Sequence, residues 1–433
     1  MKQTYRFARL LACAGLIAGT LSLWGCGSAS TYDPITPTRI VAFGDALVDV
    51  GQIGRTATIN GNVTNYRYTV NNVVTGTTTN TGNTFVEYLS SYFGFGSVTY
   101  ALDSLTAAKR LPSSGAYSYG EFGALVSGAA AFGAGTTQPT DGIDQVADAR
   151  GCRKKAASME NRRDVVVAPI NINERFCAYS LQAQIDLFLA QGAPSSNDLF
   201  VISIGTGDIM ATGIRGLTIN AAGVVAGLDV VQTDLAAAGV STTMQAAANA
   251  LAVQVKRLTD AGAKYVLIVG PPNVGRSPWA ATTGNATLFQ NLSYNTGSGV
   301  ISMGSEGLAR IQATFGNKTN NPVLFVEISG LVNTLTDGTN TTFANRTTAV
   351  CASTTNTATT VMAKSIGTGL KPVAAAGAVP AGQLSAALCT TATLGGADPS
   401  TSVYADGVNF TPSMQSQFYS QALARMRLAA WIN

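Results

Sequence analysis

Three short segments carry carboxylates where acid–base chemistry could take place. Asp45 follows an apolar run, Asp208 closes the segment 205–208, and Asp406 opens the segment 406–412. Two carboxylates near one bound water could act on it as acid and base. Aspartates in turns more often accept hydrogen bonds from the loop backbone, and we favour that role for Asp45 and Asp208.

Nucleophilic hydroxyls lack a base, because the chain of 433 residues contains no histidine. A serine hydroxyl is a poor nucleophile at neutral pH until a neighbouring base takes its proton, and histidine is the usual base. Ser127 and Ser203 are candidate nucleophiles for a relocated site, but the sequence offers no base for either of them. Ordinary serine hydrolysis is therefore not expected.

Apolar runs predict a parallel sheet covered by helices on both faces. The pattern predicts short buried strands at 39–43, 198–204, 265–269 and 322–326, and helices at 85–93, 181–191, 244–260 and 411–431. In such sheets the site lies at the carboxyl ends of the strands. We expect a β-hairpin within 54–83, a loop, lid or helix at 224–231, and loops or small β insertions at 285–320 and 338–400.

Five motifs in this order resemble the GDSL (SGNH) lipase/esterase family over about residues 38–431. The motifs are Phe43–Gly51 against FGDSLSDxG, Ser127–Ala129 against GGA, Gly205–Asp208 against GxND, Pro271–Gly275 against PDIG, and Asp406–Pro412 against DxxHPT. The resemblance implies an α/β fold, a three-layer α/β/α arrangement around a central parallel sheet. It also implies one domain over 38–433, with insertions near 54–83, 138–176 and 338–400.

The departures from the family pattern fall on the catalytic positions. Ala46 stands at the nucleophile, Gly207 at the oxyanion asparagine, and Asn409 at the histidine, whereas the orienting Asp406 is retained. The resemblance further implies oxyanion-type backbone donors at Ala46 and Gly128. It places Asp45, Leu47 and Asp208 in the pocket, which we expect Ala46 and Gly207 to enlarge.

These losses argue against useful esterase activity. Removing a whole catalytic triad leaves roughly 10³–10⁴-fold rate over water, and losing one oxyanion donor costs about 10²–10³ more. We expect a non-catalytic protein whose crevice binds an acyl chain or an acylated glycan, with no cofactor or metal. Two alternatives stay open: an esterase or lipase with a relocated site, and an envelope scaffolding or adhesive protein that uses 54–83 and 338–400.

The first 25 residues are typical of a signal peptide, with three basic residues followed by the apolar stretch Leu10–Leu23. Leu23–Cys26 resembles a bacterial lipobox, which implies acylation of Cys26, a tether over 26–37 and an outer-membrane lipoprotein. Ordinary cleavage near Ser28 or Ser30 is the alternative. Removing three basic residues lowers the net charge from +4 to +1, so nucleic-acid binding is not indicated.

Four cysteines remain in the exported part of the chain, and an oxidising compartment favours two bridges among them. Of the three connectivities we choose the sequence-local pairs, Cys152 with Cys177 and Cys351 with Cys389. Each would stabilise a long loop by roughly 3–4 kcal/mol in the loop-entropy model. A zinc site is the competing interpretation, but the cysteines lack close C-x-x-C spacing and no imidazole is present.

Overall fold

A computed structural model describes residues 34–433 with several gaps. Segments outside the description are 51–56, 60–61, 65–66, 72–81, 102–110, 122–123, 127–179, 214–215, 220–224, 230–239, 285, 295–300, 317–320, 352–385, 387–388, 390 and 392–393. The predicted signal peptide, Cys26, Ser127, Gly128, the insertion near 138–176 and the Cys152–Cys177 pair therefore lie outside the described residues.

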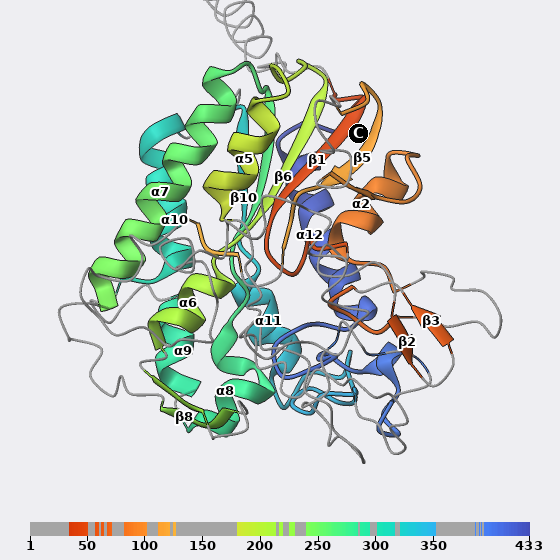
Figure 1. The fold of residues 1–433 in the computed structure, drawn as a ribbon, viewed down its shortest axis with the longest axis vertical. Helices are drawn as coiled ribbons and strands as arrows, with labels where there is room; N and C mark the ends of the chain where they lie inside the picture. The colour runs from red at the N-terminus through yellow and green to blue at the C-terminus, as the bar shows by residue number, and fades with distance from the viewer. Residues whose placement is uncertain are drawn as a thin grey trace, which may run out of the picture.

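A six-stranded sheet with every pairing parallel forms the centre of the fold, in the order β10-β9-β6-β1-β5-β4 (Figure 1). Its strands are β1 (Arg39–Gly44), β4 (Thr99–Tyr100), β5 (Gly115–Ser118), β6 (Asp198–Ser203), β9 (Tyr265–Val269) and β10 (Val323–Val326). Gly44 at the end of β1 is level with Ser203 at the end of β6. The residues that follow these two strands therefore meet at one edge.

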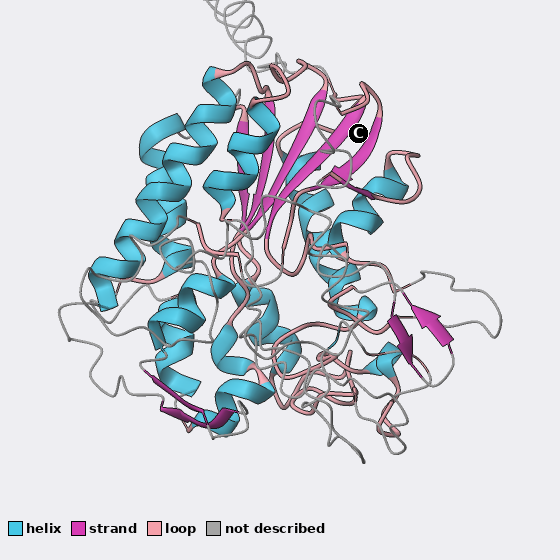
Figure 2. Cartoon of the chain, in the orientation of Figure 1, coloured by secondary structure: helices cyan, strands magenta, loops and turns pink. Residues whose placement is uncertain are grey.

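Helices cover both faces of the sheet because successive strand residues point to opposite sides. Val41 and Phe43 pack with one helical layer, and Ile40 and Ala42 pack with the other. The first layer contains α5 (Leu181–Leu189), α6 (Thr206–Gly213), α7 (Val240–Asp260), α9 (Ala286–Ser293) and α10 (Met303–Phe315). The second contains α2 (Phe85–Tyr92), α11 (Ser329–Thr336) and α12 (Pro412–Leu428). Figure 2 shows the sheet between helices, which confirms the predicted α/β architecture.

Strand and helix predictions with strong local signals are confirmed. The predicted last helix begins where proposed, because the Thr411 hydroxyl caps it by accepting from the Met414 amide. A hairpin also occurs inside 54–83, formed by β2 (Ala57–Ile59) and β3 (Asn62–Thr64). Residues 224–231 contain a strand, β8 (Val225–Asp229), which pairs with β7 (Gly216–Ile219) and forms neither the loop nor the helix that we considered.

The expectation of loops over 285–320 is wrong, because α9 and α10 occupy most of it. Two glycines in α10 lower its intrinsic helix propensity, which hid it in the sequence. Tertiary packing explains the first of them, because a Cβ on Gly304 would lie 2.6 Å from the Ser293 carbonyl oxygen. The short elements η4 (Val274–Arg276), α8 (Pro278–Thr283) and η6 (Pro399–Thr401) complete the assignment.

The predicted disulfide between Cys351 and Cys389 is present, with a Cα–Cα distance of 5.5 Å. It closes a loop with a sequence separation of 38. Within the residues that the structure describes, no helix is both long enough and apolar enough to span a bilayer.

Candidate functional site

A sharp turn after β1 positions Asp45 and Ala46. Gly44 has φ +131°, and a Cβ there would overlap the Ser203 carbonyl oxygen, so this position requires glycine. The Gln184 side chain holds both backbone groups of Gly44: its Oε1 accepts from the Gly44 amide at 2.7 Å, and its Nε2 donates to the Gly44 carbonyl at 3.0 Å. Ala46 is 8% exposed at this turn.

Asp45 and Asp208 both accept backbone hydrogen bonds, as the sequence favoured. Asp45 Oδ2 accepts from the Thr206 amide at 3.3 Å, and Asp208 Oδ2 accepts from the Val126 amide at 3.1 Å. Burial raises the pKa of each carboxyl to about 7, and the Asp45 charge contributes to the raised pKa of Asp208. Asp45 thus links the segment after β1 to the segment after β6. Asp208 links the segment after β6 to the residues that precede the second motif.

Ser203 lies close enough to Asp45 for its hydroxyl to lower the pKa of that carboxyl, although burial raises that pKa overall; the sequence did not reveal this proximity. However, Ser203 and Asp45 are each only 2% exposed, so an ester has no route to this hydroxyl in the structure. The arrangement fits a buried structural contact between neighbouring strand ends.

Position 207 is filled by neighbouring backbone. Gly207 lies in the first turn of α6, and a Cβ there would lie 2.5 Å from the Ala124 carbonyl oxygen and 3.2 Å from Leu125 Cδ2. The segment is held in place because the Leu181 amide donates to the Leu125 carbonyl at 2.9 Å. The expectation that glycine at 207 enlarges a pocket is therefore wrong.

Asn409 and Asp406 form a closed, buried pair. Asn409 Nδ2 donates to Asp406 Oδ1 at 3.1 Å and to Oδ2 at 2.9 Å. Asp406 also accepts from the backbone amides of Ala386, Val408 and Asn409 at 2.7–2.8 Å. A carboxamide can donate to the aspartate as an imidazole would, but it has no pKa near neutrality with which to take a proton.

Long-range contacts hold the turn that contains this pair. The Trp279 amide donates to the Gly407 carbonyl at 2.9 Å, and the Cys351 amide donates to the Ala405 carbonyl at 2.8 Å. Cys389, bonded to Cys351, accepts from the Asn71 amide at 2.9 Å. The disulfide therefore supports the Asp406 turn, a role that sequence reasoning did not assign to it.

One of the two expected oxyanion donors can be located. Within the described part of the chain, no acceptor lies within hydrogen-bond distance of the Ala46 amide. Gly128 falls outside the described residues. A backbone donor thus remains beside the methyl group of Ala46, although the nucleophile and the base are both missing.

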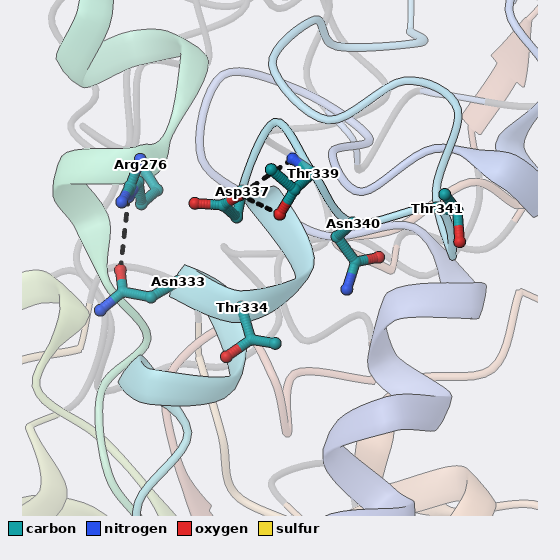
Figure 3. A pocket seen from close by; sticks show the side chains of 7 residues that line it. All are labelled: Arg276, Asn333, Thr334, Asp337, Thr339, Asn340 and Thr341. Carbon is teal, nitrogen blue, oxygen red and sulfur yellow. Dashed lines mark hydrogen bonds between the residues drawn. The ribbon is translucent and has the colours of Figure 1, made fainter.

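An open cleft of about 540 Å³ lies beyond the ends of β9 and β10 (Figure 3). Every residue that lines it is polar: Arg276, Asn333, Thr334, Asp337, Thr339, Asn340 and Thr341. Arg276 directly follows the fourth motif, and the others belong to α11 and the loop after it. The pocket residues predicted from the resemblance, Asp45, Leu47 and Asp208, are buried and do not line this cleft.

The cleft contains an opposed cation and anion. Asn333 Oδ1 accepts from Arg276 Nε at 3.4 Å and also from Asn273 Nδ2, so the Asn333 amide nitrogen is left to donate elsewhere. Asp337 Oδ1 accepts from the Thr339 amide at 2.9 Å and hydroxyl at 2.7 Å. These bonds, with smaller effects of Arg276 and Arg346, hold the Asp337 pKa below its usual value.

No protein-family model matches this chain, and no curated protein matches it. Among the residues that the structure describes, no cluster of three or more cysteine, aspartate or glutamate side chains could hold a metal ion.

Sequence reasoning missed the cleft residues. Arg276 stands one position after the Pro271–Gly275 motif, which could have drawn attention to it. Asn333 and Asp337 carry no motif, and only the packing of α11 beside η4 brings them next to Arg276. The segments 54–83 and 338–400, considered for an adhesive role, are described only in part.

Proposed function

We propose that this chain is a non-hydrolytic relative of the GDSL/SGNH ester hydrolases. It is exported, acylated at Cys26 and held at the outer membrane. It binds a polar ligand of the glycan class in the cleft between Arg276 and Asp337. No hydrolytic step is assigned to it.

The observation that carries the loss of catalysis is the Asn409–Asp406 pair. The Asn409 side-chain amide donates hydrogen bonds to Asp406, as an imidazole at this position would. Unlike an imidazole, the amide cannot accept a proton at neutral pH and so cannot act as a base. Ala46 supplies only a methyl group to the position of the attacking oxygen. The relocated alternative is weaker, because Ser203 is buried and an ester cannot reach its hydroxyl.

The lining of the cleft supports a polar ligand over an acyl chain. An acyl chain gains affinity by burying apolar surface, whereas this cleft is lined by amides, hydroxyls and one charge of each sign. Arg276, Asn333 and Asp337 together offer donors and acceptors at fixed positions, which suits the hydroxyl groups of a sugar. The glycan part of the expected acylated glycan is therefore the favoured ligand.

A catalytic assay tests the first part of the proposal. The mature protein is incubated with p-nitrophenyl butyrate and, separately, with a fluorophosphonate probe. We expect turnover at the buffer rate and no labelled adduct. Turnover that Ser203→Ala abolishes would instead establish the relocated hydrolase.

A binding experiment tests the second part. Saturation-transfer NMR with partially acetylated xylo-oligosaccharides and with octanoate should show contacts to the sugar and none to octanoate. Asp337→Asn and Arg276→Gln should weaken the sugar signal. Asp398→Asn is the matched control, because Asp398 is also exposed and accepts from the amide two residues on, but lies outside the cleft.

Three results would contradict the ligand assignment. Equal sugar signals in Asp337→Asn and Asp398→Asn would show that the cleft is not the site. Binding of octanoate in preference to the sugar would favour an acyl-chain ligand. Absence of any binding, together with loss of envelope integrity on deletion of 54–83, would favour the scaffolding alternative.

A further inference from the structure

The start of the described chain lies against its last helix. The Ile35 amide donates to the Trp431 carbonyl at 2.6 Å, and both side chains are buried in the same core cluster. The Trp431 ring contacts Tyr265 at the start of β9, with ring centroids 5.2 Å apart. The tether therefore enters the domain at the amino-terminal edge of the sheet, beside the end of α12. Figure 1 shows the C-terminus beside β1 and β5.

The described loops that lead into the strands at this edge carry no acidic residue, although Asp260, which ends α7 just before one of them, is exposed and paired with Lys256. The described loops 34–38, 111–114, 192–197 and 261–264 contain no aspartate or glutamate, and neither does 412–433. Basic residues do occur there: Lys264 precedes β9, and Arg425 and Arg427 lie in the last turn of α12. None of these three side chains forms an ion pair with an aspartate or glutamate among the described residues, and all three are exposed; Arg427 Nε donates to the Asn433 carbonyl oxygen at 3.4 Å.

An exposed apolar side chain stands among these charges. Leu428 is 81% exposed, which exceeds the 55% of Val253 and the 39% of Tyr92, the other large apolar side chains exposed in the described residues. It directly follows Arg427 at the end of α12. Basic side chains around an exposed apolar residue match the interface of an anionic lipid surface. We call Lys264, Arg425, Arg427 and Leu428 the amino-edge patch.

The tether keeps the amino-edge patch close to the acylated residue. Eight residues separate Cys26 from Ile35, and they allow a span of at most about 30 Å when fully extended. They include one acidic residue, Asp33, against the three basic residues of the patch. A tethered patch experiences a high effective concentration of lipid headgroups, so a weak interaction is enough to set its orientation.

We propose that the amino-edge patch rests on the anionic lipid surface in which Cys26 is anchored. This orientation rests on the proposed acylation of Cys26. It directs the carboxyl ends of the strands, and the cleft beyond them, away from the bilayer, since β1 alone separates the two edges by six residues, about 20 Å. The cleft then faces soluble or wall-bound glycans and not the acyl chains of its own membrane.

Quenching by brominated lipid tests the orientation. Leu428→Trp and Val253→Trp are made in the full lipoprotein and reconstituted into vesicles of phosphatidylglycerol and brominated phosphatidylcholine, with unbrominated vesicles as reference. Val253 is the control because it is exposed on α7, away from the patch. The native Trp279 and Trp431 are buried in both variants. We expect a larger loss of emission for Leu428→Trp than for Val253→Trp.

The charges are tested in the Leu428→Trp background. Lys264→Gln, Arg425→Gln and Arg427→Gln together should reduce its quenching, as should added salt. Arg310→Gln is the control, since Arg310 is partly exposed and is paired with Glu306 on α10. If the protein floats with the vesicles but Leu428→Trp and Val253→Trp are quenched equally, the proposed orientation is wrong. The acyl anchor at Cys26 is not contradicted by that result. Failure of the wild-type protein to float would contradict the acyl anchor and the orientation with it.

Discussion

The Asn409 side-chain amide donates to both carboxylate oxygens of Asp406, at 3.1 and 2.9 Å. This contact preserves the hydrogen bond that an acid–imidazole pair would make, while removing the group that could accept a proton. The backbone amides of Val408 and Asn409 bond the same carboxylate, so the turn is satisfied without a histidine. The hydrogen bonds that stabilise this turn are therefore retained, although the group that would act as a base is lost.

Restoring the two missing side chains should restore covalent reactivity. In Ala46→Ser/Asn409→His, the histidine could use the existing contact with Asp406, and the Ala46 position keeps a free backbone donor. We expect fluorophosphonate labelling in the double variant. Hydrolysis should remain about 10²–10³-fold below that of a full site, because no side-chain donor stands at 207.

The single variants are the controls for this experiment. Ala46→Ser lacks a base and Asn409→His lacks a nucleophile, so neither should be labelled, since residues of a triad act as a unit. Labelling of wild-type protein would contradict the proposed loss of catalysis. An unlabelled double variant that unfolds like wild type would show that the positions 46 and 409 are not apposed.

Adding a side chain at 207 should destabilise the protein. A Cβ there would lie 2.5 Å from the Ala124 carbonyl oxygen, and overpacking of this kind costs about 1–3 kcal/mol. Urea unfolding of Gly207→Ala measures the loss. Gly338→Ala is the control, because a Cβ at 338 would meet nothing within 4 Å. Equal stability of the two variants would show that the segment 124–126 yields easily.

The buried carboxyls Asp45 and Asp208 should make stability fall with rising pH. Each has a folded-state pKa of about 7 against an ordinary value of 3.8, so the folded protein holds a proton that the unfolded chain releases. Their contribution is fully present below about pH 4 and is lost as the pH rises towards 7. Asp208→Asn should therefore gain stability relative to wild type across this window.

Chemical unfolding at several pH values between 4 and 8 measures the difference between Asp208→Asn and wild type. Asp398→Asn provides a control of opposite sign, because hydrogen bonds from Ser400 lower the pKa of that exposed carboxyl. Its small contribution is present at high pH and lost as the pH falls. A pH-independent difference for Asp208→Asn would mean that Asp208 stays ionised when folded.

Breaking the Cys351–Cys389 disulfide should destabilise the fold and loosen the Asp406 turn. With a sequence separation of 38, the loop-entropy model gives about 4 kcal/mol. Cys351→Ser/Cys389→Ser should also increase hydrogen exchange of the amide of residue 351, which donates to Ala405, and of the Asn71 amide, which donates to residue 389. Unchanged exchange of the residue 351 amide with reduced global stability would separate the disulfide from support of the turn.

Local signals sufficed for most elements. The Thr411–Pro412 start of α12 and the apolar runs of β1, β6 and β9 were readable because capping and burial act through neighbouring residues. α10 was missed because Gly304 and Gly307 weaken the local helix signal; the glycine at 304 is explained by its close contact with Ser293. Such contacts join residues that are distant in sequence.

The types of groups available for chemistry were determined by the sequence alone: no histidine anywhere, a methyl group at 46 and an amide at 409. Tertiary structure decided what surrounds them. Packing of residues 124–126 against Gly207 filled the space that glycine was expected to open, and Ser203 was brought close to Asp45. The open cleft lies elsewhere, beside α11. Its position depends on which segments pack together and which side chains they bury, and the order of residues along the chain does not specify this.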